Sequence, residues 1–98
     1  MITPELVKLA LRRVKDPEMN LNIVDMGLIY NIRVDATDVY VDMSLTTPNC
    51  PSSEEIMTDA RYQIRGLEGV GNVYLTLVWS PPWSPELIDP RVRTYLGF

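Results

Sequence analysis

The most reactive side chain in this sequence is that of Cys50, the single cysteine of a 98-residue chain without histidine. A thiolate can bind a metal or act as a nucleophile. Without histidine, the chain has no Ser-His or Cys-His pair and no imidazole ligand. One cysteine cannot close a disulfide within a chain or supply the four ligands of a tetrahedral metal site. Metal chemistry at Cys50 would therefore need ligands from carboxylates, small thiols or a second chain.

Cys50 belongs to the segment TTPNCP at residues 46–51, which joins an expected strand to an expected helix. With Pro51 as the first helical residue, Cys50 would lie at or beside the N-cap. Unpaired backbone N–H groups and the helix dipole lower the pKa of a thiol there. Glu54 and Glu55 oppose this effect, because nearby negative charge disfavours a thiolate. The alternative is a small buried hydrophobic side chain, the commonest role of a lone cysteine.

Three carboxylates in the polar segment DPEMNLNIVDMG, residues 16–27, could supply further ligands. The functional interpretation places one or more of Asp16, Glu18 and Asp25 near Cys50, because loops at one end of a sheet tend to share an edge. The alternative is that the aspartates brace turns through hydrogen bonds to nearby backbone N–H groups. Gly27 is expected to supply a positive φ or a close backbone contact.

Polar residues next to Cys50 are expected to line the same pocket. Thr46 and Thr47 would end the second main strand where Cys50 emerges, and Asn49 directly precedes it. The alternative for the threonines is the ordinary preference of this residue type for strands.

A second candidate surface is the proline-rich tail WSPPWSP at residues 79–85. Trp83 is expected to cover the end of a small core, as large aromatic side chains do. An exposed Trp83 would instead indicate a surface for a partner protein.

Helical and strand periodicities alternate along the chain, and they predict the elements that position these residues. The expected helices cover residues 4–14, 51–66 and 91–96, and the expected strands cover residues 28–34, 39–45 and 70–79. This α-β-β-α-β-α order predicts one α+β domain over residues 1–98, a two-layer sandwich with helices on one face of a small mixed three-stranded sheet. The first two strands should form an antiparallel hairpin with one wet face. The last two should be parallel if they are neighbours, because a helical crossover joins them.

Composition excludes several classes of protein. The chain is 46% hydrophobic and 22% charged, and its 9 basic and 13 acidic residues give a net charge of −4. No basic stripe is present for a nucleic acid or an anionic lipid. No apolar run reaches the length of a membrane span, and the N-terminus does not resemble a signal peptide. A cytoplasmic protein without nucleic-acid or membrane partners is therefore expected.

Four sequence blocks together resemble the metal–sulfur (iron–sulfur) cluster assembly family, the SufT- and PaaD-like group once classed as a domain of unknown function. The blocks are DPE at residues 16–18, NIVDMGLIY at 22–30, LTTPNCP at 45–51 and WSPPW at 79–83. The resemblance implies a role in maturing iron–sulfur proteins, as an assembly or targeting factor rather than an enzyme. It also implies that Cys50 contacts the cluster or metal, that Asp16 and Asp25 are motif carboxylates, and that Thr46 and Thr47 are loop threonines.

The leading hypothesis is a non-enzymatic factor that handles an iron–sulfur cluster or iron transiently through Cys50. Its expected partners are the assembly machinery and client apoproteins, and a homodimer is a further arrangement that would bring two thiols. No monomer of this chain should hold a cluster tightly, because one cysteine is too few. Two alternatives stay open: a thiol enzyme or carrier with Cys50 as nucleophile, and an adaptor that binds partners through its tail.

Overall fold

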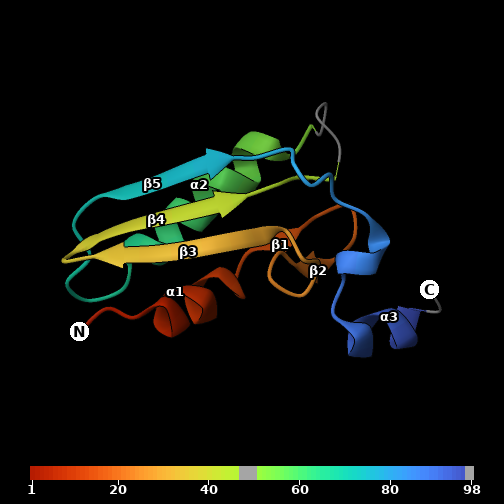
Figure 1. Cartoon of the computed structure of the whole chain (residues 1–98), viewed down its shortest axis with the longest axis horizontal. Coiled ribbons are helices and arrows are strands. Elements are labelled where there is room, and N and C mark those ends of the chain that lie inside the picture. Colours follow the sequence, from red (N-terminus) through yellow and green to blue (C-terminus); the bar gives the residue numbers. More distant parts are fainter. Residues whose placement is uncertain (47–50, 97–98) are drawn as a thin grey trace.

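The computed structural model describes residues 1–46 and 51–96, and its centre is a three-stranded sheet (Figure 1). The strands are β3 (Ile29–Asp35), β4 (Asp38–Met43) and β5 (Val73–Leu77), in the order β3-β4-β5. β3 and β4 pair antiparallel, and β4 and β5 pair parallel. The mixed sheet and the parallel pair are thus confirmed, although β5 is shorter than the expected strand.

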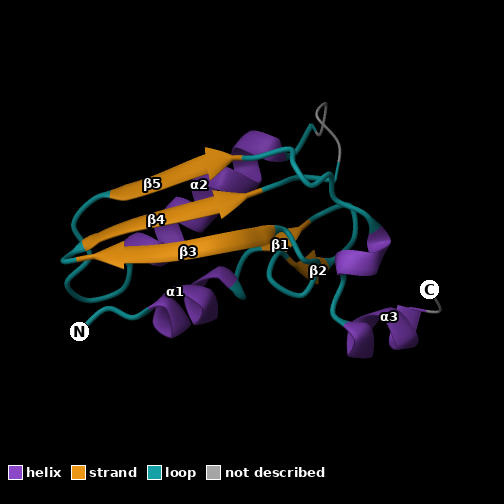
Figure 2. Cartoon of the chain, viewed as in Figure 1, coloured by secondary structure: helices purple, strands orange, loops and turns teal. Residues whose placement is uncertain are grey.

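Two helices cover one face of this sheet, as Figure 2 shows. α2 (Ser53–Arg65) crosses behind the strands and α1 (Pro4–Leu11) lies along the β3 side. Buried side chains of both helices join those of β4 in one core, and β4 contributes Val39, Val41 and Met43. The α+β sandwich is confirmed for these two layers. No helix in the described parts of the chain is long and apolar enough to cross a membrane.

The last two helical segments lie beyond the end of the sheet rather than on its face (Figure 2). These are η1 (Pro85–Leu87) and α3 (Pro90–Leu96). The chain reaches them through a proline-rich stretch that cannot continue a helix or a strand ladder. α3 begins after Asp89, whose carboxylate accepts the backbone N–H of Arg91 at 2.9 Å, and the helix expected over residues 91–96 is confirmed with a start at Pro90.

The N-terminal part differs from expectation between residues 12 and 22. α1 starts as predicted, with the Thr3 hydroxyl accepting the N–H of Leu6 at 3.2 Å, but ends at Leu11. A small antiparallel hairpin of β1 (Lys15–Asp16) and β2 (Leu21–Asn22) then occupies a segment expected to be a loop. Asn20 turns the chain with a φ of 54°. Two-residue strands leave no periodic pattern to detect.

The start of α2 corrects the expected position of Cys50. Ser52 is the N-cap, and the first helical bond runs from the Ile56 N–H to the Ser52 carbonyl at 2.9 Å. The predicted start at Pro51 is therefore wrong, and Cys50 precedes the N-cap by two positions instead of occupying it. Ser52 occupies the N-cap through its backbone carbonyl, and its side chain makes no capping bond.

The first strand of the sheet, β3, has an irregularity near Tyr30. The pairing register with β4 shifts between Ile29 and Asn31, so a β-bulge interrupts the alternation. The Tyr30 hydroxyl, next to this irregularity, donates to the Pro81 carbonyl at 2.8 Å.

Candidate functional site

The carboxyl ends of β4 and β5 lie side by side, because the two strands are parallel (Figure 1). The Val78 N–H donates to the Met43 carbonyl at 2.8 Å. This bond keeps the two segments of the chain together at the ends of β4 and β5. On the β4 side Ser44 and Leu45 are buried and Thr46 is half-buried. This edge is where the segment with Cys50 leaves the sheet. Cys50 itself, Thr47 and Asn49 lie outside the described residues.

The chain that leaves β5 forms a C-terminal tail, residues 78–89, which docks on residues 25–30, called here the dock segment. The Trp83 indole N–H donates to the Met26 carbonyl at 2.6 Å, and the half-buried ring packs against the core. The Asp89 N–H donates to the Asp25 carbonyl at 2.8 Å. Trp83 therefore has the structural role predicted for it, while Trp79 is the tryptophan with 43% of its surface exposed.

Gly27 lies at the tightest point of this docking. Its φ is +77°, a value that side-chain-bearing residues rarely adopt, and a Cβ built on it would collide with the backbone carbonyl of Leu87. The expectations of a positive φ and of a close backbone contact are both confirmed. No residue other than glycine fits here without moving the tail.

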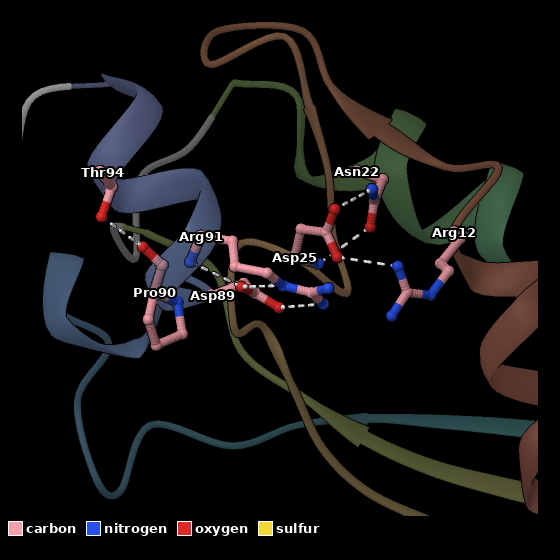
Figure 3. Close-up of polar contacts among 7 residues, drawn as sticks. All are labelled: Arg12, Asn22, Asp25, Asp89, Pro90, Arg91 and Thr94. Atoms are coloured by element: carbon pink, nitrogen blue, oxygen red, sulfur yellow. Dashed lines mark hydrogen bonds and ion pairs between the residues drawn. The ribbon is translucent and has the colours of Figure 1, made fainter.

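The Asp25 carboxylate is fully engaged within the chain (Figure 3). One oxygen contacts the Arg12 guanidinium at 3.0 Å and the other accepts the Asn22 amide N–H at 2.9 Å. The Asn22 carbonyl oxygen accepts the Asp25 backbone N–H at 2.9 Å, which closes the turn. Sequence reasoning missed Arg12, because a partner 13 positions away on another element leaves no local signal.

The other two candidate carboxylates, Asp16 and Glu18, make no hydrogen bond to Arg12, Asn22 or Asp25 among the described contacts. Asp16 is buried, with 1% of its surface exposed, and its carboxylate accepts the Glu18 backbone N–H at 2.8 Å. This is the turn-bracing bond that the alternative interpretation predicted. Glu18 is exposed to solvent.

The described carboxylates do not form a metal site by themselves. Within residues 1–46 and 51–96, no group of three or more Asp, Glu, Cys or His side chains is arranged to hold an ion. A role for Asp16, Glu18 or Asp25 beside Cys50 stays a prediction, since Cys50 is outside the described residues.

A second ion pair lies beside the first, at the start of α3 (Figure 3). Hydrogen bonds from the side chain and backbone of Arg91 lower the pKa of Asp89, and the same side-chain bond raises the pKa of Arg91. The guanidinium–carboxylate distance is 3.4 Å. A groove of about 400 Å³ between α1, β3 and the tail is lined by Arg12, Asp25 and Asp89, among others. Because both signs of charge line it, the groove is not an anion or cation site by charge alone.

Comparison with known proteins gives concordant matches. A family model described as "Iron-sulfur cluster assembly protein" matches residues 5–75. The chain is 39% identical over 97 residues to an "Fe-S protein maturation auxiliary factor" of Porphyromonas gingivalis, covering 98% of this chain and 92% of that protein. It is 33% identical over 83 residues to the "Fe-S protein maturation auxiliary factor SufT" of Staphylococcus aureus, covering 84% and 94%.

The fold has a solved counterpart as well. A conserved hypothetical protein of Thermotoga maritima superimposes with a TM-score of 0.87 at 42% sequence identity, covering 99% of this chain and 96% of that one. At this coverage the superposition includes the tail and α3.

Proposed function

We propose that this chain, which belongs to the iron–sulfur cluster assembly protein family, is a non-enzymatic maturation factor. It takes up an iron–sulfur cluster as cargo and delivers it to client apoproteins. The observation that carries the proposal is the likeness to a maturation auxiliary factor over 98% of the chain. In this proposal the cluster is handled by the segment that follows β4, which contains Cys50.

Cys50 is the residue we assign to the cargo, because it is the only thiol of the chain. Thiolates are the protein ligands that iron–sulfur clusters prefer. A single thiolate leaves the remaining iron positions to other ligands, such as small thiols or a client's cysteines. Partial ligation suits a factor that must release its cluster, whereas retention needs several cysteines from one protein.

The motif aspartates act, in this proposal, on the protein rather than on the cargo. One oxygen of Asp25 contacts Arg12 and the other accepts from Asn22. The Asp16 carboxylate accepts a backbone N–H. A carboxylate with such partners would lose them on turning to a metal. We therefore expect each aspartate to set the shape of its segment.

The test is anaerobic reconstitution of the chain with iron and sulfide, followed by transfer to an apo-ferredoxin. Wild type should take up a chromophoric cluster and load the ferredoxin faster than free iron and sulfide do. Cys50→Ser should lose both properties. Ser52→Ala is the matched control, because the Ser52 side chain makes no capping bond and the change falls in the same segment. Equal uptake by wild type and Cys50→Ser would contradict the proposal.

The rival role is a thiol enzyme or carrier with Cys50 as nucleophile. The chain has no histidine to serve as a base, and α2 places Glu54 and Glu55 in its first turn, where they oppose a thiolate. Labelling with iodoacetamide over a pH series discriminates the two roles. Reactivity that rises only near the ordinary thiol pKa of about 8.5 argues against a nucleophile.

Delivery requires partner proteins, which we propose to be the assembly machinery and client apoproteins. If the tail contributes to such contacts, the exposed Trp79 is its better candidate, because Trp83 is bonded to Met26 and packed on the core.

A further inference from the structure

The outward face of α2 carries a stripe of exposed side chains that no other described element covers. Its buried residues, Ile56, Ala60 and Ile64, face the core. The opposite face has exposed residues at the spacing of successive helical turns: Glu54, Glu55, Thr58, Arg61, Tyr62 and Arg65. Tyr62 keeps 67% of its surface exposed in the middle of this stripe.

Charge is divided along the stripe. Glu54 and Glu55 occupy its first turn, and Arg61 and Arg65 occupy its second half. None of the four takes part in an ion pair within residues 1–46 and 51–96, where the pairs are Arg12–Asp25 and Arg91–Asp89. The helix dipole favours this division of charge, but it does not require a large aromatic side chain between the two halves.

Tyr62 also separates two shallow grooves, each of about 460 Å³. The acidic groove is lined by Glu54, Glu55, Thr58, Asp59 and Tyr62. The basic groove is lined by Thr58, Arg61, Tyr62, Arg65 and Gly66. Thr58 is the small residue that both grooves share, one turn before the ring. The Tyr62 side chain therefore lies between the acidic groove and the basic groove of the stripe.

We propose that this stripe binds the same stripe of a second copy of the chain, with the two α2 helices antiparallel about a twofold axis at the level of residue 60. Residues whose numbers sum to 120 then face one another. Glu55 meets Arg65 of the second copy twice, and each Tyr62 meets the other copy's Thr58. Such a contact is isologous and closed, because the same patch serves both copies. A stripe acidic throughout or basic throughout would repel its own copy.

The proposed dimer should be weak, because the contact between the two helices is small. A helix of 13 residues is about 20 Å long at 1.5 Å per residue, so the contact belongs to the small, transient class of interfaces. The antiparallel arrangement places the two starts of α2 at opposite ends of the pair, about 20 Å apart along the axis. The two copies would then hold the first turns of their α2 helices apart.

Charge reversal tests the pairing without removing any buried group. Sedimentation velocity at increasing concentration should show a monomer–dimer equilibrium for wild type. Glu55→Arg and Arg65→Glu should each be monomeric, since each places like charges together twice. A one-to-one mixture of these two variants should dimerise again, because both contacts become opposite in sign. Glu86→Arg, an exposed change of the same kind on η1, is the control and should dimerise as wild type does.

The proposal is overturned if wild type stays monomeric up to about 1 mM, the weak end of specific association. It is also overturned if either single variant dimerises as wild type does, or if their mixture stays monomeric. Oligomeric state is read here without iron or sulfide, so a failure is distinct from a failure of the proposed cluster transfer. Both variants change exposed side chains, and thermal unfolding checks that each is folded.

Discussion

Two motif-bearing regions of the chain use their residues in different ways. In the dock segment, residues 25–30, the described contacts account for the polar groups: Asp25 binds Arg12, the Met26 carbonyl accepts from Trp83, and Tyr30 donates to Pro81. The segment that leaves β4 for α2 has its flanks fixed by burial at Leu45 and by the Ser52 cap. Cys50 itself lies outside the described residues.

Motif residues can thus either hold two segments of the fold together or supply a reactive side chain. Asp25 and Gly27 resemble site residues in sequence, yet their contacts join the tail to the body of the fold. We therefore expect the dock segment to set stability and Cys50 to set cargo binding. Substitutions in the dock segment and at the start of α3 should lower stability to different degrees.

Replacing Gly27 should have the largest effect. Gly27→Ala adds a Cβ that collides with the Leu87 carbonyl and strains a φ of +77°, so the free energy of unfolding should fall by about 3 kcal/mol or more. Gly66→Ala is the matched control, because Gly66 has a helical φ of −70° and its Cβ would meet only ordinary contacts. Urea unfolding of the two variants measures the difference. Equal stability would break the assignment of the dock segment as a joint.

Trp83→Phe removes the indole N–H and leaves the Met26 carbonyl without that donor. We expect a loss of about 1 to 2 kcal/mol, the usual cost of one unpaired buried group plus some packing. Trp79→Phe should change little, because Trp79 is 43% exposed. Thermal and urea unfolding of both variants measure this contrast. A larger loss for Trp79 than for Trp83 would reverse the roles given to the two tryptophans.

Asp25→Asn should cost less than about 1 kcal/mol, because the ion pair with Arg12 is partly exposed to solvent. The Asn22 contacts can persist with an amide in place of the carboxylate. Urea unfolding at low and at high salt checks the electrostatic part, which should shrink as salt rises. A salt-independent loss would show that the ion pair is not its source.

The smallest effect concerns the start of α3 and depends on pH. Because Arg91 lowers the pKa of Asp89 in the folded state, the ionised carboxylate stabilises the fold at pH values above the ordinary 3.8. That contribution is lost as the pH falls below 3.8 through the folded-state pKa. Melting temperatures of wild type and Asp89→Asn should therefore converge in acid and differ slightly near neutral pH. A constant difference across the series would contradict the linkage.

Much of the fold could be predicted from the sequence, because its signals are local. Thr3 before Pro4 marks a helix start, and the alternation from Val39 to Met43 marks a half-buried strand. The tiny β1–β2 hairpin could not be predicted, since two residues per strand carry no period. The start of α2 differs from the expected start at Pro51, because the sequence pattern does not decide which of two neighbouring residues begins a helix.

The sequence indicated which residues of the candidate site have special roles, but it did not indicate which residues they contact. Glycine at position 27 indicated a special backbone, and the structure shows which backbone it approaches, Leu87, 60 positions away. Arg12 and Asp89 joined the Asp25 neighbourhood only through the tertiary fold. Such contacts arise from chain segments that the sequence separates, so spacing alone cannot reveal them.

The separation of joint and cargo site is tested most directly by iron and sulfide content after anaerobic reconstitution of Asp25→Asn and Cys50→Ser in parallel. Both variants should stay folded, and each removes one candidate ligand. We expect Asp25→Asn to bind as much iron and sulfide as wild type, and Cys50→Ser to bind little of either. Loss of the cluster from Asp25→Asn with retention by Cys50→Ser would contradict this expectation.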